Sequence, residues 1–98
     1  MDDADFEWDE AKNLSNQKKH GISFEDAARV FDDPLVLLVP DGQEHDEERW
    51  RAYGQVGGTA IIMAAHTYRS RNGQEKIRII SARLATRYER QKYENENG

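Results

Sequence analysis

Apolar and charged residues are interleaved along the stretch 76–83, KIRIISAR. This pattern is typical of a strand with a buried middle and polar ends, so we predict an interior strand of a sheet. The run LVLLV at 35–39 is continuously apolar between prolines, which predicts a buried strand, and 42–47 is predicted to be a polar loop. Further strands are predicted at 6–8, 48–53 and 59–69. Short connections and the hairpin signal Asn72-Gly73 predict an antiparallel meander from residue 35 onward.

Three helices are predicted from their capping residues. The first begins after Asp9 and ends at Gly21, with cations in its last turn. The second begins after Ser23, shows apolar residues at helical spacing and ends before Pro34. The third follows the capping-box pair Thr86 and Glu89. The predicted class is α+β, a twisted antiparallel sheet of about four to five strands with two N-terminal helices and one C-terminal helix against one face.

Length and composition exclude several classes of protein. Residues 1–98 are predicted to form one domain, with 1–4 and 95–98 frayed. The absence of cysteine excludes disulfides and a thiolate nucleophile. No apolar run approaches the roughly twenty residues of a membrane span, and the acidic N-terminus lacks the positive start of a signal peptide. We therefore expect a cytoplasmic protein that does not contact a membrane.

The charges are distributed unevenly along the chain. The formal net charge is -5, yet residues 49–92 contain ten Lys or Arg against two Glu. If this half of the chain forms one face, that face attracts phosphate although the whole protein is acidic. The alternative is that the acidic and basic halves neutralise each other across the fold.

Several short motifs, in their order and spacing, resemble the BrnT toxin family over residues 6 to 93. They are WDEAK at 8–12, KHG at 19–21, SFEDAARVF at 23–31, ER at 48–49, IRIISAR at 77–83 and RYERxxY ending at Tyr93. The resemblance implies a RelE-like fold and a ribonuclease that inhibits translation. It also implies a BrnA-type antitoxin that neutralises the toxin and represses their operon with it, so that operator DNA is contacted only through the antitoxin.

RNA can be cleaved by its own 2′-hydroxyl, which attacks the neighbouring phosphate when a proton acceptor, a cation and a proton donor are in place. This chemistry requires no metal, and no cofactor is expected. Lys19, His20 and Glu48 are the candidate proton-transfer groups. Arginine is suited to bidentate contact with phosphate, and the candidate phosphate-binding residues are Arg49, Arg69, Arg78 and Arg83.

From these candidates we predict two sets of site residues. The catalytic set is Lys19, Glu48, Arg69 and Arg83, and the RNA-binding set is His20, Arg49, Arg78 and Tyr68. Single-stranded RNA is usually held by stacking of its bases, and the candidate stacking residues are Tyr68, Tyr53, Trp50 and His66. Because Arg69 and Arg83 end two strands predicted to be neighbours, we expect the two cations to lie close together on one edge.

Each assignment has a structural alternative. Glu48 beside Arg49 is compatible with an ion pair on a solvated face, and Lys19 and His20 with the cations of a helix end. Tyr93 is compatible with a packing role as well as with a proton donor. The oxygen-rich stretch 41–47 matches no calcium or zinc pattern, so no metal site is predicted. The alternative function is a non-catalytic module that binds an antitoxin or a repressor complex.

Overall fold

The structure is a computed structural model that describes residues 5–58 and 60–97. Its elements, in chain order, are β1 (Asp5–Glu7), α1 (Glu10–His20), α2 (Phe24–Ala28), the 3₁₀ segment η1 (Arg29–Asp32), β2 (Leu37–Glu44), β3 (Glu47–Val56), β4 (Ala60–Arg71), β5 (Gln74–Leu84) and α3 (Arg87–Asn97). None of the helices described is long and apolar enough to cross a membrane.

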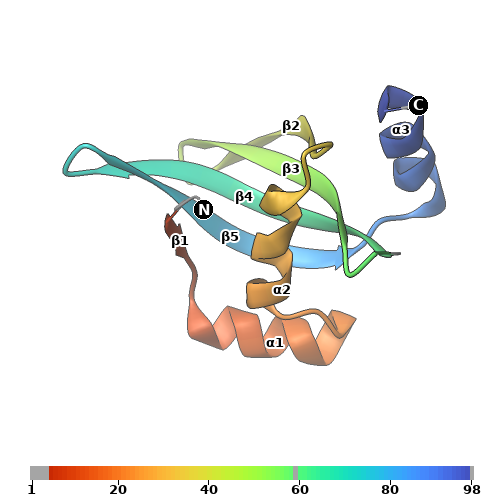
Figure 1. Ribbon diagram of the computed structural model, residues 1–98. Helices are drawn as coiled ribbons and strands as arrows, with labels where there is room; N and C mark the ends of the chain where they lie inside the picture. The colour runs from red at the N-terminus through yellow and green to blue at the C-terminus, as the bar shows by residue number, and fades with distance from the viewer. Residues whose placement is uncertain (1–4, 59, 98) are drawn as a thin grey trace.

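The strands form one sheet in the order β1-β5-β4-β3-β2. The pairs from β2 to β5 are antiparallel, which confirms the predicted meander and the α+β class. β1 pairs with β5 in parallel, so the sheet is mixed rather than wholly antiparallel. Figure 1 shows α1 beneath the β5 edge, α2 across the front of the sheet and α3 at its right-hand end.

One sheet face is closed by α2 and η1. Its core joins helix residues such as Phe24 and Val30 to alanines on three neighbouring strands, Ala52, Ala64 and Ala82. Because alanine side chains are short, the helical segments approach the sheet closely. Gly54 lies two residues after Ala52 in β3, on the same face of the sheet. A Cβ at this position would lie 2.7 Å from the carbonyl oxygen of Val30.

α3 packs on the opposite face of the sheet. Its Tyr93 is buried against Tyr53, Ile61, Met63 and Ala65, whose positions alternate with those of the first core. The prediction that all helices cover one face was therefore wrong. The helix continues to Asn97, whose side chain donates to the carbonyl of Leu35, while residues 1–4 and 98 of the termini expected to fray lie outside the described residues.

The predicted buried strand at 35–39 is instead part of an edge strand. β2 begins at Leu37, and the side chains of Leu35 and Leu38 are 50% and 42% exposed. The predicted loop at 42–47 is a hairpin between β2 and β3, with His45 and Asp46 at φ 49° and 68°. Positive φ at both central residues matches the twist of a two-residue hairpin turn, a turn that the sequence analysis did not recognise.

Two buried asparagines attach α1 to the rest of the fold. The Asn16 side chain donates to the carbonyls of Ile22 and Ala82 and accepts from the Ala82 amide. The Asn13 side chain accepts from the amide of Phe24. Polar contacts to backbone thus replace the apolar stripe that α1 lacks, and they fix the helix along the β5 edge.

Candidate functional site

Five arginines share the sheet face that α2 leaves uncovered, and we call this surface the arginine face. Strand side chains alternate between faces, and the register of the strands brings together Arg49, Arg51, Arg69, Arg78 and Arg83. All five side chains are between 26% and 33% exposed. Each is paired with at least one carboxylate, so the cations are held in defined positions.

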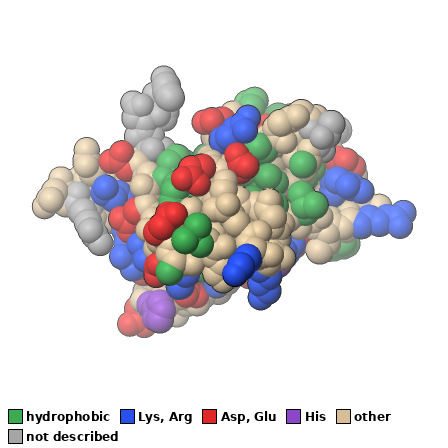
Figure 2. All heavy atoms as spheres, turned by 90° about the horizontal axis from the view of Figure 1, so that it is seen from below, with side chains coloured by type: hydrophobic (Ala, Val, Ile, Leu, Met, Phe, Trp, Pro, Cys, Tyr) green, Lys and Arg blue, Asp and Glu red, His purple; other side chains and the backbone are tan. Residues whose placement is uncertain are grey.

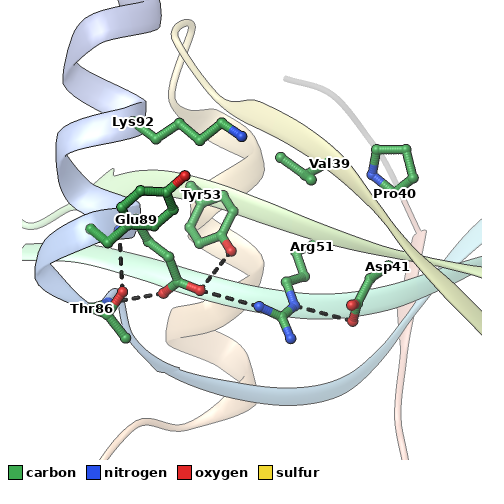
Figure 3. A pocket seen from close by; sticks show the side chains of 9 residues that line it. Val39, Pro40, Asp41, Arg51, Tyr53, Thr86, Glu89 and Lys92 are labelled. Atoms are coloured by element: carbon green, nitrogen blue, oxygen red, sulfur yellow. Dashed lines mark hydrogen bonds and ion pairs between the residues drawn. The ribbon is translucent and has the colours of Figure 1, made fainter.

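Glu89 is the centre of the first cluster (Figure 3). Its carboxylate accepts from Arg83 Nη1 and Nη2 at 2.8 and 3.1 Å, from Arg51 Nη1 at 3.1 Å and from the Tyr53 hydroxyl at 2.9 Å. The amide of Thr86 donates to it as well, at 2.9 Å, which completes the predicted capping box with the bond from the Glu89 amide to Thr86. The hydrogen bonds from Arg83 are the main cause that lowers the pKa of Glu89 to about 2.

The cluster continues along the arginine face through Asp41. Arg51 Nε lies 3.1 Å from Asp41 Oδ2, but it is buried without an aligned hydrogen bond among the described residues. Asp41 Oδ2 also accepts from Arg49 Nε at 3.1 Å, and Arg49 Nη1 donates to Glu44 at 3.0 Å. An unbroken chain of alternating charges therefore runs from Arg83 to Glu44.

A second cluster surrounds a cavity of about 130 Å³ near the β4–β5 hairpin. Arg69 Nε donates to Glu47 at 3.0 Å, and Glu7 lies between Arg69 and Arg78, 3.7 and 3.3 Å from their Nη1 atoms. Lys12, Glu44 and Thr67 also line the cavity. Thr67 is 1% exposed, and its hydroxyl has no hydrogen-bond partner within the described part of the chain.

The ion pairs show which charges of the two halves of the chain meet. The partners of Arg49, Arg69 and Arg78 all come from the acidic first half: Glu7, Asp41, Glu44 and Glu47. These three arginines are neutralised by the first half of the chain, whereas Arg83 pairs with Glu89 of the second half. Seen from the side of α1, acidic and basic side chains are also interspersed rather than separated into patches (Figure 2).

The structure places only part of the predicted catalytic set on this face. Arg69 and Arg83 lie on it, but Arg83 pairs with Met63 in the sheet, six residues from Arg69 along β4, or roughly 20 Å at the rise of a strand. The expectation that the two cations lie close together was therefore wrong. Glu48 is exposed and points to the other sheet face, because side chains alternate along β3.

The other predicted residues are divided between surfaces. Arg49 and Arg78 belong to the arginine face, on either side of Thr67 in the sheet. Lys19 and His20 are exposed in the last turn of α1, and no ion pair or hydrogen bond among the described residues joins them to the arginines. The helix-end alternative accounts for this placement.

The predicted stacking residues also differ in accessibility. His66 is fully buried, and its Nδ1 must carry the proton because it contacts the carbonyl of Ala64, leaving Nε2 to accept from the Tyr68 hydroxyl. Burial lowers the pKa of His66, so the ring is neutral at pH 7. His66 therefore cannot stack on a ligand, which corrects that prediction, whereas Tyr68 and Trp50 are partly exposed.

Sequence reasoning missed Glu47, Asp41 and Glu89 as members of the site. For Glu47 a signal exists, because strict alternation from Glu47 through Arg49 and Arg51 places these side chains on one face and Glu48 on the other. Glu89 was recognised only as a capping residue, and its contact with Arg51 spans 38 positions.

A family model described as "Ribonuclease toxin, BrnT, of type II toxin-antitoxin system" matches residues 8–89. The crystal structure of the ribonuclease toxin BrnT from Brucella abortus is similar, with a TM-score of 0.60 and 26% identity, covering 87% of this chain and 100% of that one. A search of curated proteins gave no match.

Proposed function

Since this chain belongs to the BrnT family of ribonuclease toxins of type II toxin-antitoxin systems, we propose that it is a metal-independent endoribonuclease that binds RNA on its arginine face. The observation that carries this proposal is the cavity near the β4–β5 hairpin. There, three cations meet two carboxylates and a buried hydroxyl without a partner in the described chain: Lys12, Arg69, Arg78, Glu44, Glu47 and Thr67.

The proposed reaction needs no group beyond RNA and side chains. The 2′-oxygen forms a bond to phosphorus as its proton moves to a base, and the bond from phosphorus to the 5′-oxygen breaks as that oxygen takes up a proton. The products are a 2′,3′-cyclic phosphate and a 5′-hydroxyl. The additional negative charge on the phosphate is stabilised by cations already fixed in position.

Arg69 is the proposed stabiliser of the reacting phosphate, and Glu47 is the proposed proton acceptor. Glu47 lies on the arginine face, 3.0 Å from Arg69 Nε, so a phosphate bound by Arg69 has a carboxylate beside it. Glu48 and Lys19 are the alternative proton acceptors. Substitution of each of the three residues in turn tests which one acts as the base. A phosphate that enters the cavity also offers acceptor oxygens to the Thr67 hydroxyl, which otherwise carries the cost of an unpaired buried group.

Arg83 is proposed to bind a different phosphate of the same RNA. Because Arg83 is roughly 20 Å from Arg69 along the strand, one phosphate cannot contact both. Glu89 fixes the Arg83 guanidinium through two nitrogens, so little side-chain freedom is lost on binding. Arg49 and Arg78 extend the contact surface between these two points.

The proposed partner is an antitoxin of the BrnA type, which neutralises the toxin and joins it in repressing their operon, so that DNA is contacted through the antitoxin. One observation favours the second candidate function, a non-catalytic module that binds the antitoxin. Every cation of the arginine face is already paired with a carboxylate, and an RNA must compete for them.

The test is cleavage of a defined RNA by the purified, antitoxin-free protein, with and without EDTA, followed by analysis of the product ends. We expect cyclic-phosphate ends that form equally well with the chelator. Arg69→Ala and Glu47→Gln should each lower kcat by about 100-fold or more. Arg90→Ala, which removes an exposed cation of α3, is the control and should retain activity.

Three results would contradict parts of this proposal. Loss of cleavage in EDTA, or products with 5′-phosphate ends, would exclude the metal-free mechanism. Full activity of Glu47→Gln with an inactive Glu48→Gln or Lys19→Ala would reassign the base. No cleavage by a protein that is folded by circular dichroism and binds its antitoxin would favour the non-catalytic module.

A further inference from the structure

A pocket of about 370 Å³ lies between β2, β3 and α3, beside the arginine face. It is lined by Val39, Pro40, Asp41, Arg51, Tyr53, Thr86, Tyr88, Glu89 and Lys92 (Figure 3). Arg49 links this pocket to the cavity near the β4–β5 hairpin, because it pairs both with Asp41 and with Glu44, which lines that cavity. An RNA chain on the arginine face thus passes the pocket.

The two walls of the pocket differ in chemistry. Val39 and Pro40 of β2 form an apolar wall, and α3 supplies Tyr88 and Lys92 on the other side. Residues four apart in a helix lie on the same side, so the tyrosine ring and the ammonium group are neighbours. Tyr88 is 72% exposed, and Figure 3 shows Lys92 reaching from α3 toward Val39.

The floor offers a donor beside an acceptor. Arg51 donates to Glu89 through Nη1 and lies beside Asp41 through Nε, and among the described residues no hydrogen-bond partner of its Nη2 group is identified. The contacts of Asp41 use Oδ2, which leaves Oδ1 able to accept. Glu89, in contrast, is saturated by its donors. Adjacent donors and acceptors are the pattern that the edge of a nucleobase presents.

We propose that this pocket is a nucleobase subsite of the ribonuclease, an inference that rests on the proposed function. One base stacks on Tyr88 against the β2 wall, its edge binds Arg51 and Asp41, and Lys92 contacts a phosphate of the same nucleotide. An aliphatic side chain of a protein partner would offer nothing to Oδ1 of Asp41 or to the remaining donors of Arg51 in a half-closed pocket, which is costly. A heteroaromatic ring can stack on Tyr88 and also hydrogen-bond through its edge to Arg51 and Asp41.

The experiment measures binding of five-nucleotide RNAs by fluorescence anisotropy, with 2′-O-methyl groups that prevent cleavage. One oligomer is complete, and five others each lack the base at one position. The wild-type protein should bind one of these abasic oligomers about tenfold more weakly, since stacking on an aromatic side chain contributes about that factor or more. Tyr88→Ala should weaken binding of the complete oligomer and should lose less affinity than the wild type does when that base is missing.

Two further variants separate stacking from other effects. Tyr88→Phe keeps the ring and should bind as the wild type does, and Arg90→Ala should keep the dependence on the missing base. Because Tyr88 is 72% exposed, its substitution should leave the thermal midpoint unchanged. The inference is overturned if Tyr88→Ala distinguishes the abasic oligomers as strongly as the wild type does, or if it leaves RNA binding intact while it weakens antitoxin binding.

The failure of this inference is distinguishable from failure of the proposed function. A wild-type protein that cleaves RNA but binds every abasic oligomer equally overturns the subsite and leaves the ribonuclease. A wild-type protein that neither cleaves nor binds RNA overturns both.

Discussion

Glu89→Gln tests the charge cluster that orders one end of the arginine face. The substitution preserves the shape of the side chain and removes the charge that pairs with Arg83 and Arg51. In the folded protein the pKa of Glu89 falls from its usual 4.5 to about 2. The side chain is 13% exposed, so solvent screens the interaction only partly.

The size of the effect follows from the linkage between ionisation and folding. At about 1.4 kcal/mol per pKa unit, the lowered pKa corresponds to roughly 3 kcal/mol of stability at pH 7. Because the folded pKa is depressed, this stability is complete above pH 4.5 and is lost as the pH falls toward 2. Glu89→Gln should therefore lower the thermal midpoint at pH 7 by roughly 10 to 25 °C.

The assay is urea unfolding followed by circular dichroism at pH 7 and at pH 3. The stability difference between wild type and Glu89→Gln should be about 3 kcal/mol at pH 7 and should narrow to roughly 1.4 kcal/mol at pH 3. Glu94→Gln, an exposed position on the same helix, is the matched control. A difference below about 1 kcal/mol at pH 7, or one that is the same at both pH values, would refute the reasoning.

Two further substitutions test the packing of the helices on the sheet. Gly54→Ala places a Cβ 2.7 Å from the Val30 carbonyl oxygen, so we expect a loss of about 2 kcal/mol in urea unfolding; an unchanged midpoint would show that η1 can shift away from β3. Asn16→Leu removes the bonds to both backbone groups of Ala82 and should cost about 3 kcal/mol. The exposed neighbour Ser15→Ala should cost little, and equal losses at the two positions would contradict the role of Asn16.

The accuracy of the fold prediction depended on how local each signal was. Asp9 and Gly21 cap α1 as predicted, and Thr86 bonds with Glu89 as the capping box requires. These signals involve residues a few positions apart, which the sequence displays directly. The run at 35–39 was misplaced because hydrophobicity alone does not distinguish an edge strand, which Leu38 leaves partly exposed, from a central one.

The candidate site depended on contacts that the order of residues does not reveal. The proposed roles of Arg69 and Glu47 arise from their meeting across the sheet, and Glu89 reaches Arg51 only because α3 folds back over β3. Glu47 and Glu48 are adjacent in β3. Because side chains alternate along a strand, the two glutamates lie on opposite faces of the sheet.

By itself, the sequence determined the start of each helix, the end of α1, the hairpin at Asn72-Gly73, the α+β class and the resemblance to the BrnT family, because each follows from local spacing. It also displayed the opposite charges of the two halves. Only the tertiary structure decided that these charges pair with each other on one face. The reason is physical: strand register and the return of α3 fix which charges meet, and both depend on packing between segments that are distant in the chain.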